Sequence, residues 1–342
     1  MDQNISRKAA YGSFLIIPLK YDPDSLDLKR IEQIGTGLSM TTMDLNENVK
    51  AMLTPSDPAS IGSGWMIRSG ELSASLCSQA AGTPCTGFQV ADDTGCFDFE
   101  LNDSWLYVFH TRTAFLCLSL SFRQMETLET ICNPGWAYNP ASFFWIDGTG
   151  SRHPFSIDQW LSGFLNPLGL HKFFDGASSF LLEAYAYIFA VLPEWFQTLE
   201  EMKKIVFNLH KMVPIDAPGE DEAEEDIRYA YAARNVDAGA YRWGCCITSQ
   251  TISYIIADEN MDFAAQRDAQ ADDGLPVVLL ALYEKYTCLR FTELITRMKK
   301  NQIRELKDLM LTFQAFGTVT PANLSRWHNV KQIYANLLEV ND

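Results

Sequence analysis

The most constraining feature of this sequence is the order of its hydrophobic patterns. Up to about residue 212, short runs of β-branched and aromatic residues, such as Phe14–Lys20 and Glu183–Leu192, alternate with helical segments. From Asp258 onward the patterns are helical only. Alternation of this kind is typical of a sheet covered by helices, and neighbouring runs that can form hairpins make the sheet mixed. We therefore expect an α/β (α+β) fold, a mixed sheet with flanking helices followed by a C-terminal bundle of long antiparallel helices.

The same order divides the 342 residues into two expected parts. Residues 1–257 form the predicted α/β sheet domain, and residues 258–342 form the predicted helical bundle packed on it. Within the first part, residues 36–96 are rich in Pro, Gly, Ser and Thr, which predicts a loop-rich insertion with short strands. The segment 213–227 is predicted to be an acidic loop, because Asp216–Asp226 holds seven acids and no base.

Local signals place several helix boundaries. Capping-box patterns predict helices that start after Ser121, Ser156 and Thr198. In the C-terminal third, Leu275–Lys300 is apolar nearly all round at its start, which indicates a buried helix. A further amphipathic helix is predicted from residue 303 to 316, and Thr320 is predicted to cap the last one.

The charge balance excludes some functions. Lys and Arg number 27 against 43 Asp and Glu, which gives a net charge of −16. Such a surface repels phosphate backbones and anionic lipid, so we expect no nucleic-acid partner. The longest strongly apolar stretch without a charge, Trp243–Ala257, is too short to span a membrane. The N-terminus lacks the apolar run of a signal peptide, and we expect a cytoplasmic protein.

The eight cysteines indicate free thiols rather than a disulfide framework or a zinc site, because no Cys-x-x-Cys occurs. Cys117 and Cys288 lie in apolar runs, where we expect them to be buried. Cys245 and Cys246 are neighbours in a strand-like run, so their side chains should point to opposite faces.

No motif predicts a catalytic or metal site. The five histidines show no i, i+3 or i+4 pair and no HExxH, and the sequence lacks GxSxG and SxxK. His171 and Asp175 are four residues apart, which favours a surface pair over a catalytic dyad. Paired carboxylates such as Asp272 and Asp273 follow from the acidic composition. We therefore predict no catalytic residue and assign no cofactor or metal ligand.

Aromatic residues are dense between residues 136 and 180. Packing between helices and a sheet is one reading of this density, since aromatic rings dominate ordinary cores. The other reading is a pocket for a nucleotide or a small ligand, in which His153, Asp158 or His171 would act. The aromatic residues concerned are Trp136, Tyr138, Phe143, Phe144, Trp145, Phe155, Trp160, Phe164, Phe173, Phe174 and Phe180.

The stretch Leu275–Phe291 (LPVVLLALYEKYTCLRF) resembles the helical hairpin start of CorA-like magnesium-transporter proteins, in particular their soluble bacterial relatives. The order of elements across residues 180–340 is similar as well. The resemblance implies a metal-binding homo-oligomer, with Mg²⁺ as the candidate divalent cation. The Gly-Met-Asn motif of the transporters is not found here, and neither is a spanning segment, so no ion-conducting pore is expected. The resemblance fits either a soluble relative or the cytoplasmic part of a longer protein.

Three functions are therefore open. The leading one is a non-catalytic CorA-like domain that senses a cation or ligand, or serves as an interaction module. The second is an effector or enzyme that binds a nucleotide or small ligand through the aromatic-rich region 136–180. The third is a structural or interaction protein.

Overall fold

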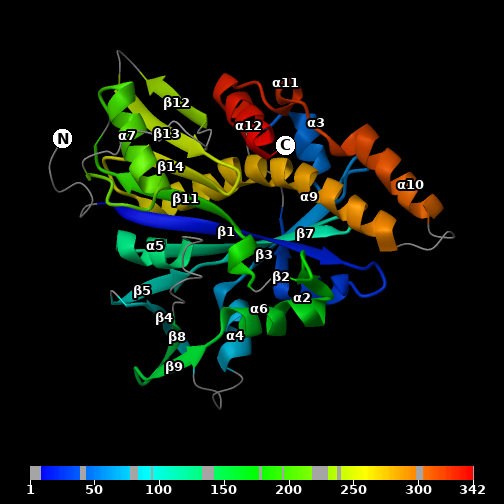
Figure 1. The fold of residues 1–342 in the computed structure, drawn as a ribbon, viewed down its shortest axis with the longest axis horizontal. Coiled ribbons are helices and arrows are strands. Elements are labelled where there is room, and N and C mark those ends of the chain that lie inside the picture. Colours follow the sequence, from blue (N-terminus) through cyan, green and yellow to red (C-terminus); the bar gives the residue numbers. More distant parts are fainter. Residues whose placement is uncertain are drawn as a thin grey trace.

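The computed structural model describes most of the chain, and Figure 1 shows its ribbon. Its described residues form a mixed sheet flanked by helices, which confirms the predicted α/β fold class. The ranges described are 9–38, 44–77, 84–93, 95–132, 142–176, 179–194, 196–217, 230–236, 240–297 and 303–341.

The sheet has fourteen strands in the described part of the chain, and β1 (Ala10–Tyr21) lies at its centre. β1 pairs antiparallel with β7 (Thr113–Phe122) on one side and with β11 (Tyr185–Leu192) on the other. β11 is parallel to β14 (Thr251–Ala257). The path runs β12-β13-β14-β11-β1-β7-β5-β4-β8-β9. The other strands are β2 (Gly35–Gly37), β3 (Gly62–Ile67), β4 (Cys85–Ala91), β5 (Cys96–Leu101), β6 (Ser104–Phe109), β8 (Ser142–Asp147), β9 (Arg152–Phe155), β10 (Leu170–Lys172), β12 (Ala230–Val236) and β13 (Ala240–Ile247).

The central place of β1 is notable because its Pro18 is typical of an edge strand. The pairing with β11 ends at Ile16, and the pairing with β10 begins at Leu19. Pro18 thus lies where β1 has no partner on that side. Because proline has no backbone N–H, the sheet loses no interstrand hydrogen bond at this position.

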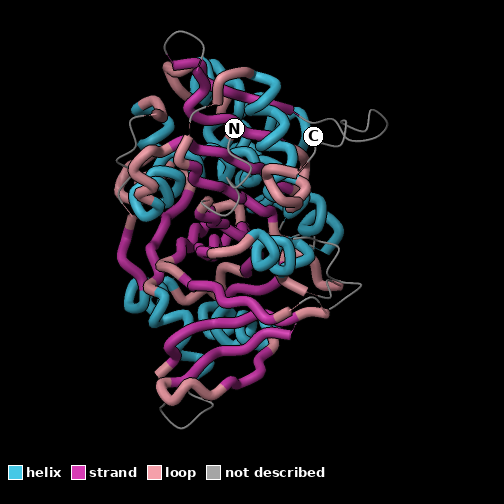
Figure 2. Tube along the Cα trace, turned by 90° about the vertical axis from the view of Figure 1, so that its left-hand side faces the viewer, coloured by secondary structure: helices cyan, strands magenta, loops and turns pink. Residues whose placement is uncertain are grey.

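Helices cover both faces of the sheet, and two hydrophobic cores result. Alternate residues of β1 point to opposite faces: Leu15 belongs to the first core and Phe14 to the second. Figure 2 shows the strands along the length of the molecule with helices beside them. The first core takes in α2 (Leu28–Ile34), α4 (Ser69–Cys77), α5 (Met125–Cys132), α6 (Ile157–Leu165) and α7 (Leu199–His210), and the second takes in α3 (Glu47–Met52), α8 (Phe263–Ala269), α9 (Leu275–Arg297), α10 (Ile303–Thr312), α11 (Pro321–Leu324) and α12 (His328–Asn341).

The C-terminal helices pack on the sheet, and the predicted bundle of long antiparallel helices is not confirmed. Among the described C-terminal helices only α9, with 23 residues, is long, and α10 and α12 contact it (Figure 1). The predicted last helix is broken into α11 and α12, because Ser325 between them is extended and its hydroxyl accepts from the N–H of Trp327. None of the described helices is long and apolar enough to cross a membrane.

Two of the three predicted helix starts are confirmed. The hydroxyls of Ser156 and Thr198 accept from the N–H three residues on, at the starts of α6 and α7. The start after Ser121 is wrong, because Ser121 pairs with Gly12 and Glu100 in the sheet and α5 begins only at Met125. Tertiary strand pairing overrides the local capping signal there.

Two of the cysteine predictions are confirmed, and one is wrong. Cys245 lies in the second core and Cys246 in the first, so the two thiols point to opposite faces. Cys117 is buried, as predicted. Cys288 is exposed, because its apolar neighbours in the sequence are buried on other faces of α9. Of the acidic segment 213–227, residues 218–227 lie outside the described residues. The segment 36–96 contributes β2, α3, β3, α4 and β4.

Candidate functional site

The structure gives the three polar residues of the aromatic-rich region separate partners. His153 Nε2 lies 2.9 Å from Asp147 Oδ2, and its ring stacks on Trp145 with 4.2 Å between centroids. Asp158 pairs with Lys172 at 2.9 Å and accepts from the N–H of Phe180. These contacts explain the two side chains as structural groups.

The predicted pair of His171 and Asp175 is wrong. His171 Nδ1 lies 3.2 Å from Asn166 Oδ1, whereas Asp175 pairs with Lys20 at 2.7 Å and with Arg297. The pair requires a helix, but His171 belongs to the short strand β10 and a turn follows it. Residues four apart are not neighbours in extended chain.

Most of the aromatic rings between residues 136 and 180 that the structure describes are core residues. Phe155 contacts both Phe143 and Trp160 at the first core, whereas Phe173 belongs to the second. The space among the rings of the first core is only about 20 Å³. Trp136 and Tyr138 lie outside the described residues.

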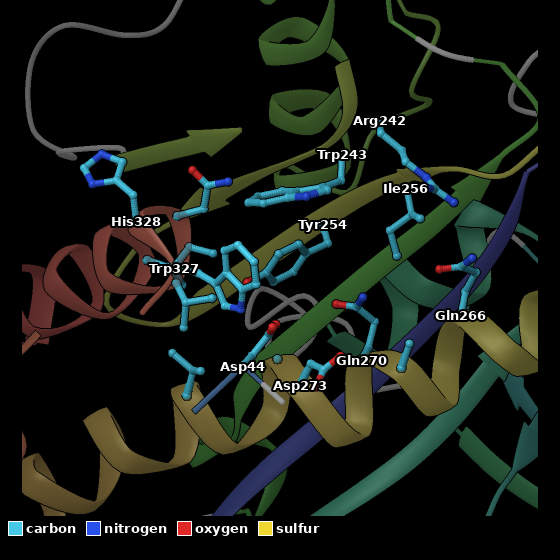
Figure 3. A pocket seen from close by; sticks show the side chains of 16 residues that line it. Asp44, Arg242, Trp243, Tyr254, Ile256, Gln266, Gln270, Asp273, Trp327 and His328 are labelled. Carbon is cyan, nitrogen blue, oxygen red and sulfur yellow. The ribbon is translucent and has the colours of Figure 1, made fainter. Parts of the chain in front are cut away.

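A much larger cavity, of about 530 Å³, lies between the second face of the sheet and the C-terminal helices (Figure 3). We call it the aromatic–acidic cavity. It joins segments that are far apart in the sequence: Asp44, strands β13 and β14, the helices α8 and α9, and the start of α12. Its lining residues are Asp44, Arg242, Trp243, Tyr254, Ile256, Gln266, Ala269, Gln270, Asp273, Gly274, Val277, Trp327, His328, Asn329, Val330 and Ile333.

The strands contribute two rings. β13 and β14 pair with Cys245 opposite Tyr254, so Trp243, two residues from Cys245, points to the same face. The rings of Trp243 and Tyr254 lie 6.1 Å apart, and Tyr254 also stacks on Tyr187 at 5.2 Å. Tyr254 is buried, and Trp243 is half-buried at the cavity wall. A rigid sheet thus positions the aromatic wall.

A π-helical turn, Gln270–Gly274, lies between α8 and α9 and forms part of the helical wall of the cavity. The Tyr187 hydroxyl donates to Gln270 Oε1 at 2.5 Å. A Cβ on Gly274 would lie 2.2 Å from the same hydroxyl, so only glycine allows the helix this close to the sheet. The turn widens the helix by one residue and places Gln270 and Asp273 at the cavity. π-Turns of this kind occur frequently at functional sites.

The third wall is the corner between α11 and α12. The Ser325 hydroxyl donates to the carbonyl of Asp44, and the Asn46 side chain donates to the carbonyl of Asn323 at 2.8 Å. These bonds hold Asp44 and the start of α12 against one another. Trp327, at this corner, is 46% exposed, and the guanidinium of Arg326 lies 4.7 Å from its ring centroid.

The carboxylates give the cavity a negative field. Burial raises the pKa of Asp272, and the charges of Asp273 and Asp268 raise it further. Burial also raises the pKa of Tyr187, with Asp273 among the charges that contribute. Arg242 at the rim contributes to a lowered pKa at Asp258, where the N–H of Asn260 is the largest cause.

None of these residues belongs to a sequence motif that predicts a site. Trp243 and Tyr254 were visible only as strand-like residues, and Asp273 only as one of many acids. The cavity is made by tertiary packing of four segments, and no spacing along the chain reports that. Within the residues that the structure describes, no group of three or more His, Cys, Asp and Glu could hold a metal ion.

Comparison with known proteins returns no significant match to this chain, whether to a family model, to a curated protein or to a solved structure.

Proposed function

We propose that this protein is a non-catalytic ligand-binding module and that its site is the aromatic–acidic cavity. The observation that carries the proposal is the cavity itself. Its volume of about 530 Å³ falls within the roughly 300–1,000 Å³ of small-molecule sites. Its apolar walls carry a few converging polar groups, among them Gln266, Gln270 and Asp273, which is the composition typical of such sites.

The walls of the cavity explain how binding would be sensed. Strands β13 and β14 form one wall, the α8–α9 segment another, and the α11–α12 corner the third. A ligand that contacts all three walls links the C-terminal helices to the sheet. Any molecule that binds only the folded protein shifts its unfolding equilibrium by mass action. Binding would therefore stabilise the docking of these helices.

The resemblance of Leu275–Phe291 to CorA-like proteins supports the same class of function, a sensing or interaction module. It also proposes Mg²⁺ as a ligand and a homo-oligomer as the assembly. The organic ligand of the cavity and the Mg²⁺ response are separate expectations, so the test treats them as separate arms.

The experiment is a thermal-shift screen of the whole chain against cationic, neutral and anionic small molecules, with Mg²⁺ at millimolar concentration as a further arm. A blocking variant, Ala269→Trp, fills the cavity from an exposed helical position. The matched control, Ala265→Trp, adds the same side chain to an exposed position of α8 outside the cavity lining.

We expect at least one organic compound to raise the melting temperature of the wild type and of Ala265→Trp but not of Ala269→Trp. The proposal is overturned if no compound shifts the wild type, or if every shift persists in Ala269→Trp. Light scattering measures the Mg²⁺ arm, and an unchanged mass and melting temperature at millimolar Mg²⁺ would remove the metal-sensing version.

A further inference from the structure

A second cavity, of about 320 Å³, lies between the turn that joins β6 to β7 and the C-terminal half of α10. We call it the Tyr283 cavity. Residues 58–61 form one wall, His110 and Thr111 of the turn another, and α10 with the π-helical turn Phe313–Gly317 a third, while Tyr283 of α9 lies among them. Its volume is at the lower end of the roughly 300–1,000 Å³ of small-molecule sites.

Buried aromatic rings form the inner surface of the Tyr283 cavity. Tyr283 stacks on Phe109 with 4.4 Å between centroids, and it meets Phe313 edge-on at 5.6 Å. Tyr283 and Phe313 are both buried. A Cβ on Gly317 would lie 2.5 Å from the ring of Phe313, so glycine allows the π-helical turn to pack closely on that ring. The rings are therefore in place without a ligand, as is usual for small-molecule sites.

Backbone hydrogen bonds hold the opposite wall. The N–H of Ile61 donates to the carbonyl of Met52 at 2.8 Å, which ties the loop to the end of α3. The N–H of His110 donates to the carbonyl of Ile61 at 2.9 Å, which ties the same loop to the β6–β7 turn. A cavity with walls fixed in this way loses little conformational entropy when a ligand binds.

The hydroxyl groups of the Tyr283 cavity are engaged with the protein itself. Thr111 Oγ1 lies 2.9 Å from Thr287 Oγ1, and the buried hydroxyl of Tyr283 hydrogen-bonds with these two threonines. The hydroxyls of Ser60 and Thr312 donate to main-chain carbonyls at 2.6 and 2.9 Å. A charged ligand would therefore lose its hydration without gaining equivalent partners, which disfavours it.

The described lining residues also carry no Asp, Glu, Lys or Arg side chain that could neutralise a charged ligand. Arg112, which follows the lining residue Thr111, is already paired with Glu305. His110 differs from the other polar residues. In the described part of the chain its imidazole has no hydrogen-bond partner, and partial burial of the ring lowers its pKa, which favours the neutral form. A neutral imidazole offers both a donor and an acceptor.

We propose that the Tyr283 cavity is a second binding site, which takes an uncharged, largely apolar ring compound with one hydrogen-bonding group directed at His110. Rings of the ligand would pack on Tyr283 and Phe313, where burial of apolar surface drives binding. The inference goes beyond the proposed function, because the described linings of the two cavities share no residue.

The first test compares three probes of the same shape. Equilibrium dialysis of the whole chain at pH 7.5 measures the Kd of naphthalene-2-methanol, of the anion 2-naphthoate and of the cation 2-naphthylmethylammonium. We expect the uncharged alcohol to bind at least about tenfold more tightly than either ion, because neither ion recovers its lost hydration.

Variants then locate the site. Ala59→Trp adds a large side chain at an exposed lining position and should weaken binding of the alcohol at least about tenfold. The matched control, Ser56→Trp, adds the same side chain to an exposed position of the same loop outside the described lining. The control and Ala269→Trp, which blocks the aromatic–acidic cavity, should leave the affinity unchanged.

A further variant tests the polar contact. His110→Leu should weaken naphthalene-2-methanol about fivefold, the worth of one hydrogen bond, and should leave the hydrocarbon 2-methylnaphthalene unaffected. An equal effect on the two compounds would show that His110 gives the ligand no hydrogen bond and would overturn that part of the proposal.

The site assignment is wrong if none of the three probes binds, if an ion binds as tightly as the alcohol, or if binding survives in Ala59→Trp. Loss of binding in Ala269→Trp would place the alcohol in the aromatic–acidic cavity, which overturns this inference and supports the proposed function. Binding that is lost in Ala59→Trp alone supports the second site whatever the outcome at the first.

Discussion

At the scale of single residues, backbone geometry makes Gly169 hard to replace. Gly169 follows the 3₁₀ turn Asn166–Leu168 with a φ of +76°, and a Cβ there would lie 2.0 Å from the carbonyl oxygen of Ser25. Gly150 has a φ of +84° but open space around it. The two glycines thus share the left-handed backbone and differ in crowding.

We expect Gly150→Ala to lower the free energy of unfolding by roughly 1–2 kcal/mol, the cost of a left-handed Ala. Gly169→Ala should cost about 1–3 kcal/mol more, because the carbonyl of Ser25 is backbone and must move. Urea unfolding of both variants measures the difference. Equal losses would show that the contact with Ser25 relaxes freely.

The surroundings of Glu183 disfavour its charged form. Burial raises its pKa to about 7, against the opposing bond from the N–H of Phe174 and the charge of Lys172. The unfolded carboxyl titrates near its ordinary value of about 4.3. The folded state therefore holds the proton more tightly, and stability is lost as the pH rises from about 4.5 through 7.

Glu183→Gln removes this titration and keeps the size of the side chain. We expect the variant to be more stable than the wild type at pH 8 and to lose that advantage towards pH 4.5. Urea unfolding at pH 4.5, 6 and 8 is the measurement. If the variant gains the same stability at all three pH values, the charge of the carboxylate is not the cause of the gain.

At the scale of elements, the start of α7 shows that a cap can be identified from local pattern alone. Thr198 Oγ1 accepts from the N–H of Glu201 at 3.1 Å, and the carboxylate of Glu201 accepts from the N–H of Gln197. Thr320 stands at the corresponding position of α11, but its side chain makes no capping bond. The pair offers an internal comparison of a bonded and an unbonded cap.

We expect Thr198→Ala to lower the free energy of unfolding by about 1 kcal/mol. Thr198→Ser keeps a hydroxyl and should retain most of the stabilisation that the cap provides. Thr320→Ala should change it by less than about 0.5 kcal/mol. Chemical denaturation with circular-dichroism detection compares the three. The cap assignment is wrong if Thr198→Ala and Thr320→Ala lower the free energy of unfolding by the same amount.

At the scale of the whole molecule, buried ion pairs tie the C-terminal helices to the sheet. Glu293 of α9 binds Lys20 of β1 at 2.6 Å and Arg290 at 2.7 Å. Arg290 also donates to the carbonyl of Tyr21 at 3.0 Å. The side chains of Lys20 and Arg290 are only 9% and 4% exposed, and Glu293 is the carboxylate that they share. Each cation has a second, more exposed partner: Asp175 lies 2.7 Å from Lys20, and Asp22 lies 3.1 Å from Arg290.

Glu293→Gln should therefore lower the free energy of unfolding by about 2 kcal/mol, since it removes the carboxylate shared by the two buried cations and leaves them only the more exposed Asp175 and Asp22. The pair of Lys50 with the exposed Glu47 provides the control, and Glu47→Gln should change the stability by less than about 0.5 kcal/mol. Equilibrium unfolding in urea measures both. Similar losses in the two variants would show that burial does not strengthen the α9 pair.

Local signals predicted those features of the fold that depend on neighbours in the chain. The alternation of strands and helices predicted the mixed α/β class, and Thr198 and Ser156 predicted their helix starts, because a cap bonds groups three residues away. The opposite faces of Cys245 and Cys246 followed from the period of a strand.

Long-range packing decided the rest. Ser121 pairs with β1 and β5 and is therefore part of a strand, although its local pattern predicts a helix start. Pro18 is tolerated in the central strand β1 because neither β10 nor β11 pairs with it on that side. The aromatic–acidic cavity joins Asp44, Tyr254, Asp273 and Trp327, which only the folded chain brings together. The sequence by itself determined the alternation of strands and helices and the starts of α6 and α7, since these depend on local period and capping. Which residues share a site was decided by the tertiary structure, because contacts between distant segments leave no spacing along the chain.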